Sequence, residues 1–162
     1  MMKGTCLCGA VSFEIEGALE HAPDACHCSQ CRKQTGHFLV SVNVRRKALT
    51  VHGADKVTWY RSSKQVRRGF CSVCGSSLFW DPTIVPDPQA QPEWFEIAAG
   101  LLDDDPGVRP GKHIYVDFKA AWFDIDGHLP LFDKQAILQH RADAGQRAAG
   151  FDRGVTRTKE DI

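Results

Sequence analysis

All seven cysteines of this 162-residue chain lie in three short stretches: Gly4-Thr5-Cys6-Leu7-Cys8-Gly9, Cys26-His27-Cys28-Ser29-Gln30-Cys31 and Phe70-Cys71-Ser72-Val73-Cys74-Gly75. Two of the clusters are pairs and one is a trio. Two pairs supply the four ligands of a closed structural zinc site, whereas catalytic zinc sites commonly use three protein ligands and leave a fourth position open. The spacing therefore predicts one metal ion that stabilises the fold and one that takes part in catalysis.

Metal binding explains these cysteines better than disulfide bonding does. An odd number of thiols cannot pair completely, and C-x-C and C-x-x-C spacings in a reduced compartment more often bind metal or carry redox chemistry. A thioredoxin-type role for Cys71-x-x-Cys74 requires a strand–helix–strand context, which the surrounding sequence does not indicate. We therefore expect the three clusters to hold metal.

The two pairs, Cys6 with Cys8 and Cys71 with Cys74, are expected to form one four-cysteine site. Side chains of an extended C-x-C segment point to one side, because strand residues alternate between two faces. A glycine follows the last cysteine of each pair and permits a positive φ, so that the turn can close around an ion. Tetrahedral sites with four sulfur ligands favour zinc or the iron of an iron–sulfur cluster. Because this cysteine spacing is unlike the common ferredoxin patterns, we expect zinc.

The trio Cys26, Cys28 and Cys31 is dense enough to hold a second zinc without help from distant residues. Its fourth ligand could be a histidine, with His27, His37 and His113 as candidates. If the fourth position stays open, a small-molecule thiol bound there would be held as a thiolate. A purely structural second ion is the alternative that the spacing leaves open.

Outside the clusters, alternating apolar and polar residues predict a β-rich domain of layered antiparallel sheets. The expected strands span residues 11–16, 38–44, 57–61, 77–80, 94–97, 113–118 and 121–125. Three prolines and no periodicity predict a loop over residues 83–92. A short C-terminal helix is expected over residues 134–149, followed by a flexible tail over 150–162, so that the β domain spans residues 1–133.

Composition excludes several classes of function. The formal net charge is zero, and seven thiolates with two Zn²⁺ ions would lower it to −3, which disfavours nucleic-acid binding. The two short basic clusters, 45–47 and 61–68, are most simply solvated surface, with an anchor for an anionic substrate as the alternative. No apolar run is long enough to span a membrane, and no signal-peptide pattern opens the chain, so we expect a cytoplasmic protein.

The three cysteine stretches, together with His113-Ile114-Tyr115-Val116 and Leu129-Pro130-Leu131-Phe132, resemble the glutathione-dependent formaldehyde-activating family, which includes a centromere protein V branch. The resemblance covers about residues 3–133 and matches all seven cysteines in order and spacing. It implies layered antiparallel sheets of the kind called a β-tent. It also implies two zinc ions per chain, held by two groups of cysteines: Cys6, Cys8, Cys71 and Cys74 in one, and Cys26, Cys28 and Cys31 in the other.

The activity implied by the resemblance is that of a carbon–sulfur lyase, which adds glutathione to formaldehyde to give S-hydroxymethylglutathione. The trio Cys26, Cys28 and Cys31 would then be the catalytic group, and a small thiol the partner. Arg32, Lys33 and the 61–68 stretch are candidate contacts for glutathione's carboxylates. The alternatives are a non-enzymatic zinc-binding module and a carrier of thiols or zinc.

Overall fold

The computed structural model describes residues 1–82 and 93–125, and the chain divides into two compact units, Met1–Phe123 and Asp124–Ile162. The loop expected over 83–92, the helix over 134–149 and the tail over 150–162 lie outside the described residues. In the described part of the chain, no helix is long and apolar enough to cross a membrane.

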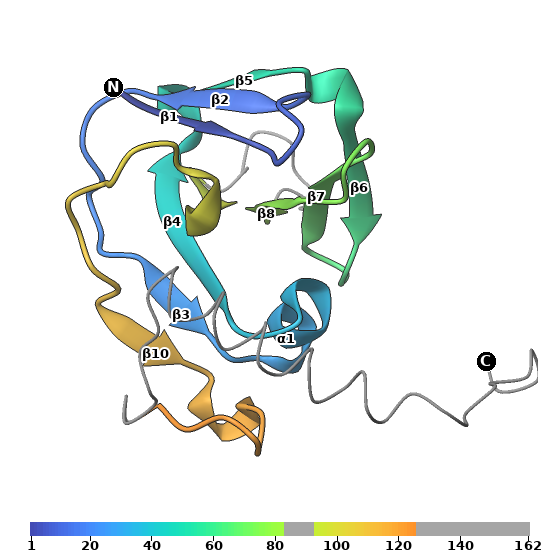
Figure 1. Ribbon diagram of the computed structural model, residues 1–162, viewed down its shortest axis with the longest axis vertical. Helices are drawn as coiled ribbons and strands as arrows, with labels where there is room; N and C mark the ends of the chain where they lie inside the picture. Colours follow the sequence, from blue (N-terminus) through green and yellow to red (C-terminus); the bar gives the residue numbers. More distant parts are fainter. Residues whose placement is uncertain (83–92, 126–162) are drawn as a thin grey trace, which may run out of the picture. The chain divides into compact units, whose positions relative to one another are not determined.

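The first unit is built mainly from strands (Figure 1). The strands are β1 (Met2–Thr5), β2 (Ser12–Ile15), β3 (Asp24–Cys26), β4 (Leu39–Arg45), β5 (Leu49–His52), β6 (Val57–Arg61), β7 (Arg67–Cys71), β8 (Ser77–Asp81), β9 (Trp94–Ala98) and β10 (Lys112–Ile114). The helical elements are α1 (Ser29–Thr35) and the single 3₁₀ turns η1 (Arg46–Ala48), η2 (Ala54–Lys56), η4 (Ala99–Leu101) and η5 (Val116–Phe118).

The strands form two sheets, as the alternating pattern predicts. A small antiparallel sheet has the order β1-β2-β5, and a larger one has the order β10-β3-β4-β9-β8-β7-β6. At one edge of the larger sheet, β10 pairs with β3 in parallel, from Lys112 opposite Asp24 to Ile114 opposite Cys26. The sheets of the described residues are antiparallel as expected except at this edge, where the chain returns by a long connection rather than by a hairpin.

One face of the larger sheet forms the hydrophobic core together with the small sheet. The residues paired across β6, β7, β8, β9 and β4 on this face are Trp59, Gly69, Phe79, Ile97 and Val42. Phe13 of β2 meets Phe79 with the ring centroids 6.3 Å apart in an edge-on arrangement. Phe13, Ile15, Val42 and Ile97 are fully buried, so this layer contributes the main hydrophobic stabilisation.

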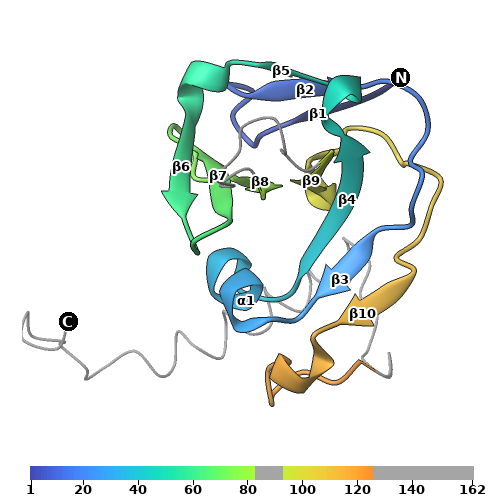
Figure 2. The ribbon, with the colours of Figure 1, turned by 180° about the vertical axis from the view of Figure 1, so that it is seen from behind.

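The opposite face of the same sheet carries the polar side chains and faces α1. Its paired residues, in the same strand order, are Tyr60, Arg68, Trp80, Glu96 and Asn43. In Figures 1 and 2, α1 and the small sheet lie on opposite sides of the larger sheet. Because strand residues alternate between faces, each strand contributes to the core on one side and to a polar layer on the other.

Helix α1 is the one α-helix among the described residues, and the sequence did not predict it. It spans only seven residues, with Cys28 as its N-cap and Gly36 as a left-handed C-cap at φ 82°. Cys31 is its one buried residue, so α1 has no apolar stripe of the kind that periodicity arguments detect. Its position is set by the trio and by the sheet beneath it, rather than by an amphipathic face.

Five of the seven expected strands correspond to β2, β4, β6, β8 and β9. The strand expected over 113–118 stops at Ile114, because Tyr115 takes a left-handed conformation (φ 56°) and η5 follows. No strand forms over residues 121–125, which are turn and irregular backbone. Strands β1, β3, β5 and β7 were not predicted, since three are short and β7 begins with two charged residues, Arg67 and Arg68.

Candidate metal centres and the adjacent cavity

The structure brings Cys6, Cys8, Cys71 and Cys74 into one cluster with all sulfurs within 4.8 Å of one another. The Sγ–Sγ distances are 3.6 Å for Cys6–Cys8, 3.7 Å for Cys6–Cys71 and 3.9 Å for Cys8–Cys71. Tetrahedral Zn–S bonds of about 2.3 Å place sulfurs about 3.8 Å apart. The cluster therefore has the dimensions of a four-thiolate zinc site.

Each pair reaches this geometry through a turn that ends at a glycine. Gly9 N–H donates to the Cys6 carbonyl at 2.9 Å, and Gly75 N–H donates to the Cys71 carbonyl at 2.9 Å. Both glycines have φ 76°, a conformation that other residues adopt at a cost. Their expected role in closing the turns is confirmed. The side-chain hydroxyl of Ser76 and then its backbone lower the pKa of Cys74 to about 5, which favours the thiolate there.

The second cluster, here called the trio, is Cys26 at the end of β3, Cys28 at the N-cap of α1 and Cys31 within α1. Its three sulfurs also lie within 4.8 Å of one another, so these residues could hold a second ion. The Cys31 amide donates to Cys28 Sγ at 3.4 Å, which ties the cluster to the first turn of the helix. The seven cysteines thus form two separate groups, and all seven thiols are free of disulfides.

None of the three candidate histidines joins the trio's group of ligand atoms. His27 is buried, and its Nε2 lies 2.8 Å from Nδ1 of His113. The His27 ring also stacks near Phe38 and Phe123. Burial first, and then the charge of His113, lower the pKa of His27, so it is neutral at physiological pH. His27 is therefore a buried histidine that packs among aromatic rings.

The trio lines a cavity of about 450 Å³. Beside the three cysteines, the walls come from α1, from the polar face of the larger sheet and from the segment after β10: Ser29, Gln30, Ser63, Val66, Arg68, Trp80, Glu96, Ile114, Tyr115 and Phe118. A second cavity of about 410 Å³ shares Gln30 and Arg68 with it and is also lined by Lys33 and Tyr60. This space is of the size that binds small molecules.

Arg68 places a buried positive charge against the trio. Its side chain is buried at 5% exposure, and Nη1 donates to Cys31 Sγ at 3.6 Å. Its other hydrogen-bond acceptors are neutral: Gln34 Oε1 at 2.9 Å, Ser62 Oγ at 3.2 Å and Gln30 Oε1 at 3.3 Å. No carboxylate of the described residues forms an ion pair with it.

A buried guanidinium without a carboxylate needs another negative partner. Three thiolates around a Zn²⁺ ion carry a net charge of −1, which Arg68 would neutralise. Burial raises the pKa of Cys31 to about 12, although the charge of Arg68 acts against this rise, and burial also raises the pKa of Cys26. Without a cation these thiols would stay protonated at neutral pH, so the donor set and its surroundings fit a divalent metal.

Three arginines of the two basic clusters form ion pairs. Arg46 and Arg67 both pair with the fully buried carboxylate of Asp81, and Arg45 pairs with Glu20 and Glu93. These three side chains are partly buried, whereas Arg61 and the lysines of both clusters are exposed, so solvated surface describes the clusters only in part.

The two basic residues next to the trio in sequence diverge in space. Arg32 borders a small cavity with His27, His37 and Phe123, away from the trio's cavity, and its Nε has no hydrogen-bond partner in the described structure. Lys33 lines the second cavity. Of this pair, only Lys33 is placed to meet a ligand near the trio.

Sequence reasoning did not single out Trp80, Glu96 and Tyr115 as site residues, and it treated Arg68 only as part of a cluster. All four line the trio's cavity. The polar positions of alternating strands contain Arg68 and Glu96, but the pattern does not tell whether the polar face meets water or a helix. The strand pairing decides this, because it places Arg68, Trp80 and Glu96 in one row beneath α1.

A layered β protein with one four-cysteine centre and one three-cysteine centre beside a cavity defines the class. The family model of the glutathione-dependent formaldehyde-activating enzyme matches residues 1–118, and the chain belongs to this family. A Halomonas elongata protein, provisionally named as such an enzyme, is 31% identical over 78% of this chain and 82% of its own length.

Two further comparisons agree with this membership. An uncharacterized lyase of Schizosaccharomyces pombe is 23% identical over 85% of this chain and 94% of its own length. The crystal structure of a Rhodobacter sphaeroides protein matches with a TM-score of 0.52 and 29% identity, covering 67% of this chain and 98% of that one. The fold is therefore shared with an experimentally determined structure.

Proposed function

We propose that this protein is a zinc-dependent carbon–sulfur lyase that joins a small thiol, glutathione, to formaldehyde and releases S-hydroxymethylglutathione. The observation that carries the proposal is the trio at the wall of a 450 Å³ cavity, with the buried charge of Arg68 against Cys31. The family membership supports the same chemistry, since the family is described by its dependence on glutathione and its action on formaldehyde.

The residues assigned to the two metal centres follow from the clusters. Cys6, Cys8, Cys71 and Cys74 would hold a structural zinc, and Cys26, Cys28 and Cys31 would hold a second zinc. When bound at the trio, zinc supplies a position at which a thiol is held as its thiolate. The catalytic role of the trio rests on its three-ligand set, because catalytic zinc sites keep a position for substrate whereas structural sites do not.

The surrounding residues would bind and orient the thiol. Gln30 and Arg68 line both the trio's cavity and the second cavity, so the two lie next to each other and the second has room for the rest of a tripeptide. Lys33 in the second cavity supplies positive charge for a carboxylate of the ligand. Tyr115 and Phe118 contribute aromatic side chains to the trio's cavity, against which the ligand would pack.

In the reaction, the thiolate sulfur forms a bond to the carbonyl carbon of formaldehyde. The C=O π electrons move to the oxygen, which takes up a proton and becomes the hydroxyl of the product. Because glutathione and formaldehyde also combine without a catalyst, the enzyme must hold both reactants together and supply the proton.

Native mass spectrometry of the purified protein, titrated with glutathione, tests the proposal. We expect two zinc ions per chain and one saturable glutathione adduct. An adduct with glutathione but not with S-methylglutathione would show that the free thiol is required. Two zinc ions without any adduct would contradict the proposed substrate and leave a purely structural role for the second ion.

A further inference from the structure

One carboxyl group in the trio's cavity has no role in the steps above. Glu96 lies on β9, opposite Trp80 of β8 and Asn43 of β4, on the polar face of the larger sheet. Among the described residues that line this cavity, it is the one carboxylate. It is half-buried in the body of the protein, where an ionisable side chain is unusual without a function or a partner.

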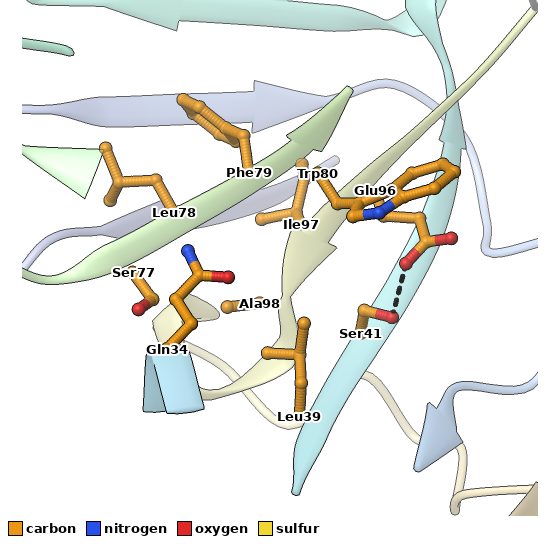
Figure 3. Close-up of a pocket in the computed structure, with 10 residues that line it drawn as sticks. All are labelled: Gln34, Leu39, Ser41, Ser77, Leu78, Phe79, Trp80, Glu96, Ile97 and Ala98. Carbon is orange, nitrogen blue, oxygen red and sulfur yellow. Dashed lines mark hydrogen bonds between the residues drawn. The ribbon is translucent and has the colours of Figure 1, made fainter. Parts of the chain in front are cut away.

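The position of Glu96 is fixed by a neutral donor. Ser41 Oγ on β4 donates to Glu96 Oε2 at 2.8 Å, and Figure 3 shows this bond beside the indole of Trp80. No described cation forms a salt bridge with Glu96. Its other oxygen, Oε1, accepts no hydrogen bond from the described residues and is available to a ligand in the cavity.

The charged and titratable groups around Glu96 come from several elements. Asp24 on β3 and Arg68 on β7 act on it electrostatically, while the trio and Tyr115 share its cavity. β4 and β8 present it with the uncharged Ser41, Asn43 and Trp80. Burial and then Asp24 raise the pKa of Glu96 above its usual 4.5, while Ser41 and Arg68 act against the rise. A carboxyl group whose pKa is raised towards neutrality is suited to proton transfer.

We propose that Glu96 is the acid–base residue of this site and carries the thiol's own proton to the product. The ionised Glu96 accepts the S–H proton as glutathione binds beside the trio. The thiolate then bonds to the formaldehyde carbon, the C=O electron pair moves to oxygen, and Glu96 returns the proton to form the hydroxyl. The carboxylate is regenerated, so no further acid, base or oxidant is needed, and the reverse reaction uses the same path.

This inference rests on the proposed function. It can be tested without turnover by measuring how many protons are released for each glutathione bound. Glutathione is titrated calorimetrically into the zinc-loaded protein at pH 7 in buffers of different ionisation enthalpy. The Glu96→Gln variant keeps the shape of the side chain and can still accept from Ser41, but it cannot take up a proton. It should release about one proton per glutathione bound, because the thiol loses its proton on binding. The wild type should release less than half as much.

Glu14→Gln is the matched control. It makes the same chemical change on β2 of the other sheet, where Glu14 pairs with the exposed Lys3. It should behave as the wild type in proton release and rate. Equal proton release from the wild type and Glu96→Gln would overturn the role of Glu96, whereas absence of glutathione binding to the wild type would overturn the proposed function together with it.

The pH dependence of catalysed exchange between glutathione and formaldehyde gives a second, independent readout. Because the ionised form of Glu96 accepts the proton, kcat/KM of the wild type should rise with pH through an acidic limb above pH 4.5. Glu96→Gln should lose this limb and about 10²–10⁴-fold in rate. An unchanged acidic limb in Glu96→Gln, in protein that retains both zinc ions, would show that Glu96 only supports the sheet.

Discussion

The two cysteine clusters present the same kind of side chain in different settings. The four-cysteine cluster joins residues 63 positions apart, from Cys8 in the first turn to Cys71 at the end of β7, and its tips Leu7 and Val73 are exposed. The trio takes all its ligands from six consecutive residues, and its surroundings are a cavity, a buried arginine and a carboxyl group. A centre that connects distant strands can stabilise the fold, whereas a local centre is free to present a position to a ligand.

The two clusters also differ in their charged surroundings. In both clusters the pKa values of the thiols diverge: the pKa is lowered for Cys74 and raised for Cys8 in the first, and lowered for Cys28 and raised for Cys31 in the second. Among the described residues, a buried guanidinium, that of Arg68, lies against a sulfur of the trio. Metal content, stability and turnover should therefore respond separately to changes in the two regions.

Removing a ligand of the four-cysteine cluster should have the largest effect. Cys71→Ala should lose one zinc and most of the soluble yield, because a structural zinc contributes on the order of 10 kcal/mol to folding. This is comparable with the whole free energy of unfolding of a small domain, about 5–15 kcal/mol. Metal content by mass spectrometry and yield of soluble protein check it, with the neighbouring exposed Ser72→Ala as control. A well-folded Cys71→Ala protein with two zinc ions would contradict the assignment.

Removing a ligand of the trio should abolish activity but spare the fold. Cys28→Ser should lose the second zinc and the glutathione adduct, while the four-cysteine cluster keeps its ion. Serine is a good N-cap, so it can replace Cys28 Sγ as the acceptor of the Cys31 amide and preserve α1. Zinc content, circular dichroism and turnover measure the three effects. Unchanged turnover in this variant would exclude a catalytic trio.

Removing the charge beside the trio should weaken the second centre alone. Arg68→Met keeps an unbranched apolar side chain but leaves the negative trio without its buried cation. Loss of such a supporting contact typically costs about 10–100-fold in metal affinity. A competing chelator should therefore remove the second zinc more readily from Arg68→Met than from the wild type. Arg61→Met, which changes an arginine with exposed contacts only, should behave as the wild type. Equal resistance to the chelator in all three proteins would show that Arg68 does not balance the trio.

The smallest expected effect tests the turn that closes the four-cysteine cluster. Gly75→Ala places a Cβ where nothing lies within 4 Å, so its only cost is the left-handed backbone at φ 76°. We expect a loss of about 1–2 kcal/mol in the free energy of unfolding. Gly100→Ala also meets nothing within 4 Å but has no positive φ, and it should be close to neutral. Urea unfolding of both variants gives the difference, and equal midpoints would refute a conformational requirement at Gly75.

Local sequence patterns determined the cysteine centres and much of the sheet. C-x-C and C-x-x-C spacing is a short-range signal, and it singled out the cysteines of both clusters that the structure assembles. Period-two alternation likewise predicted β2, β4, β6, β8 and β9. These features could be predicted because ligand spacing and side-chain alternation depend only on neighbours along the chain.

Only the tertiary structure decided which polar residues surround the trio. Arg68 and Glu96 are ordinary polar positions in alternating strands, and their register with Trp80 and Asn43 brings them together on one face. Helix α1 packs over part of this face, where its Gln30 and Gln34 accept hydrogen bonds from Arg68, although its seven residues carry no periodic signal of their own. Strand register and helix placement depend on contacts between residues far apart in the chain, so the sequence defined the ligands of the centre but not its environment.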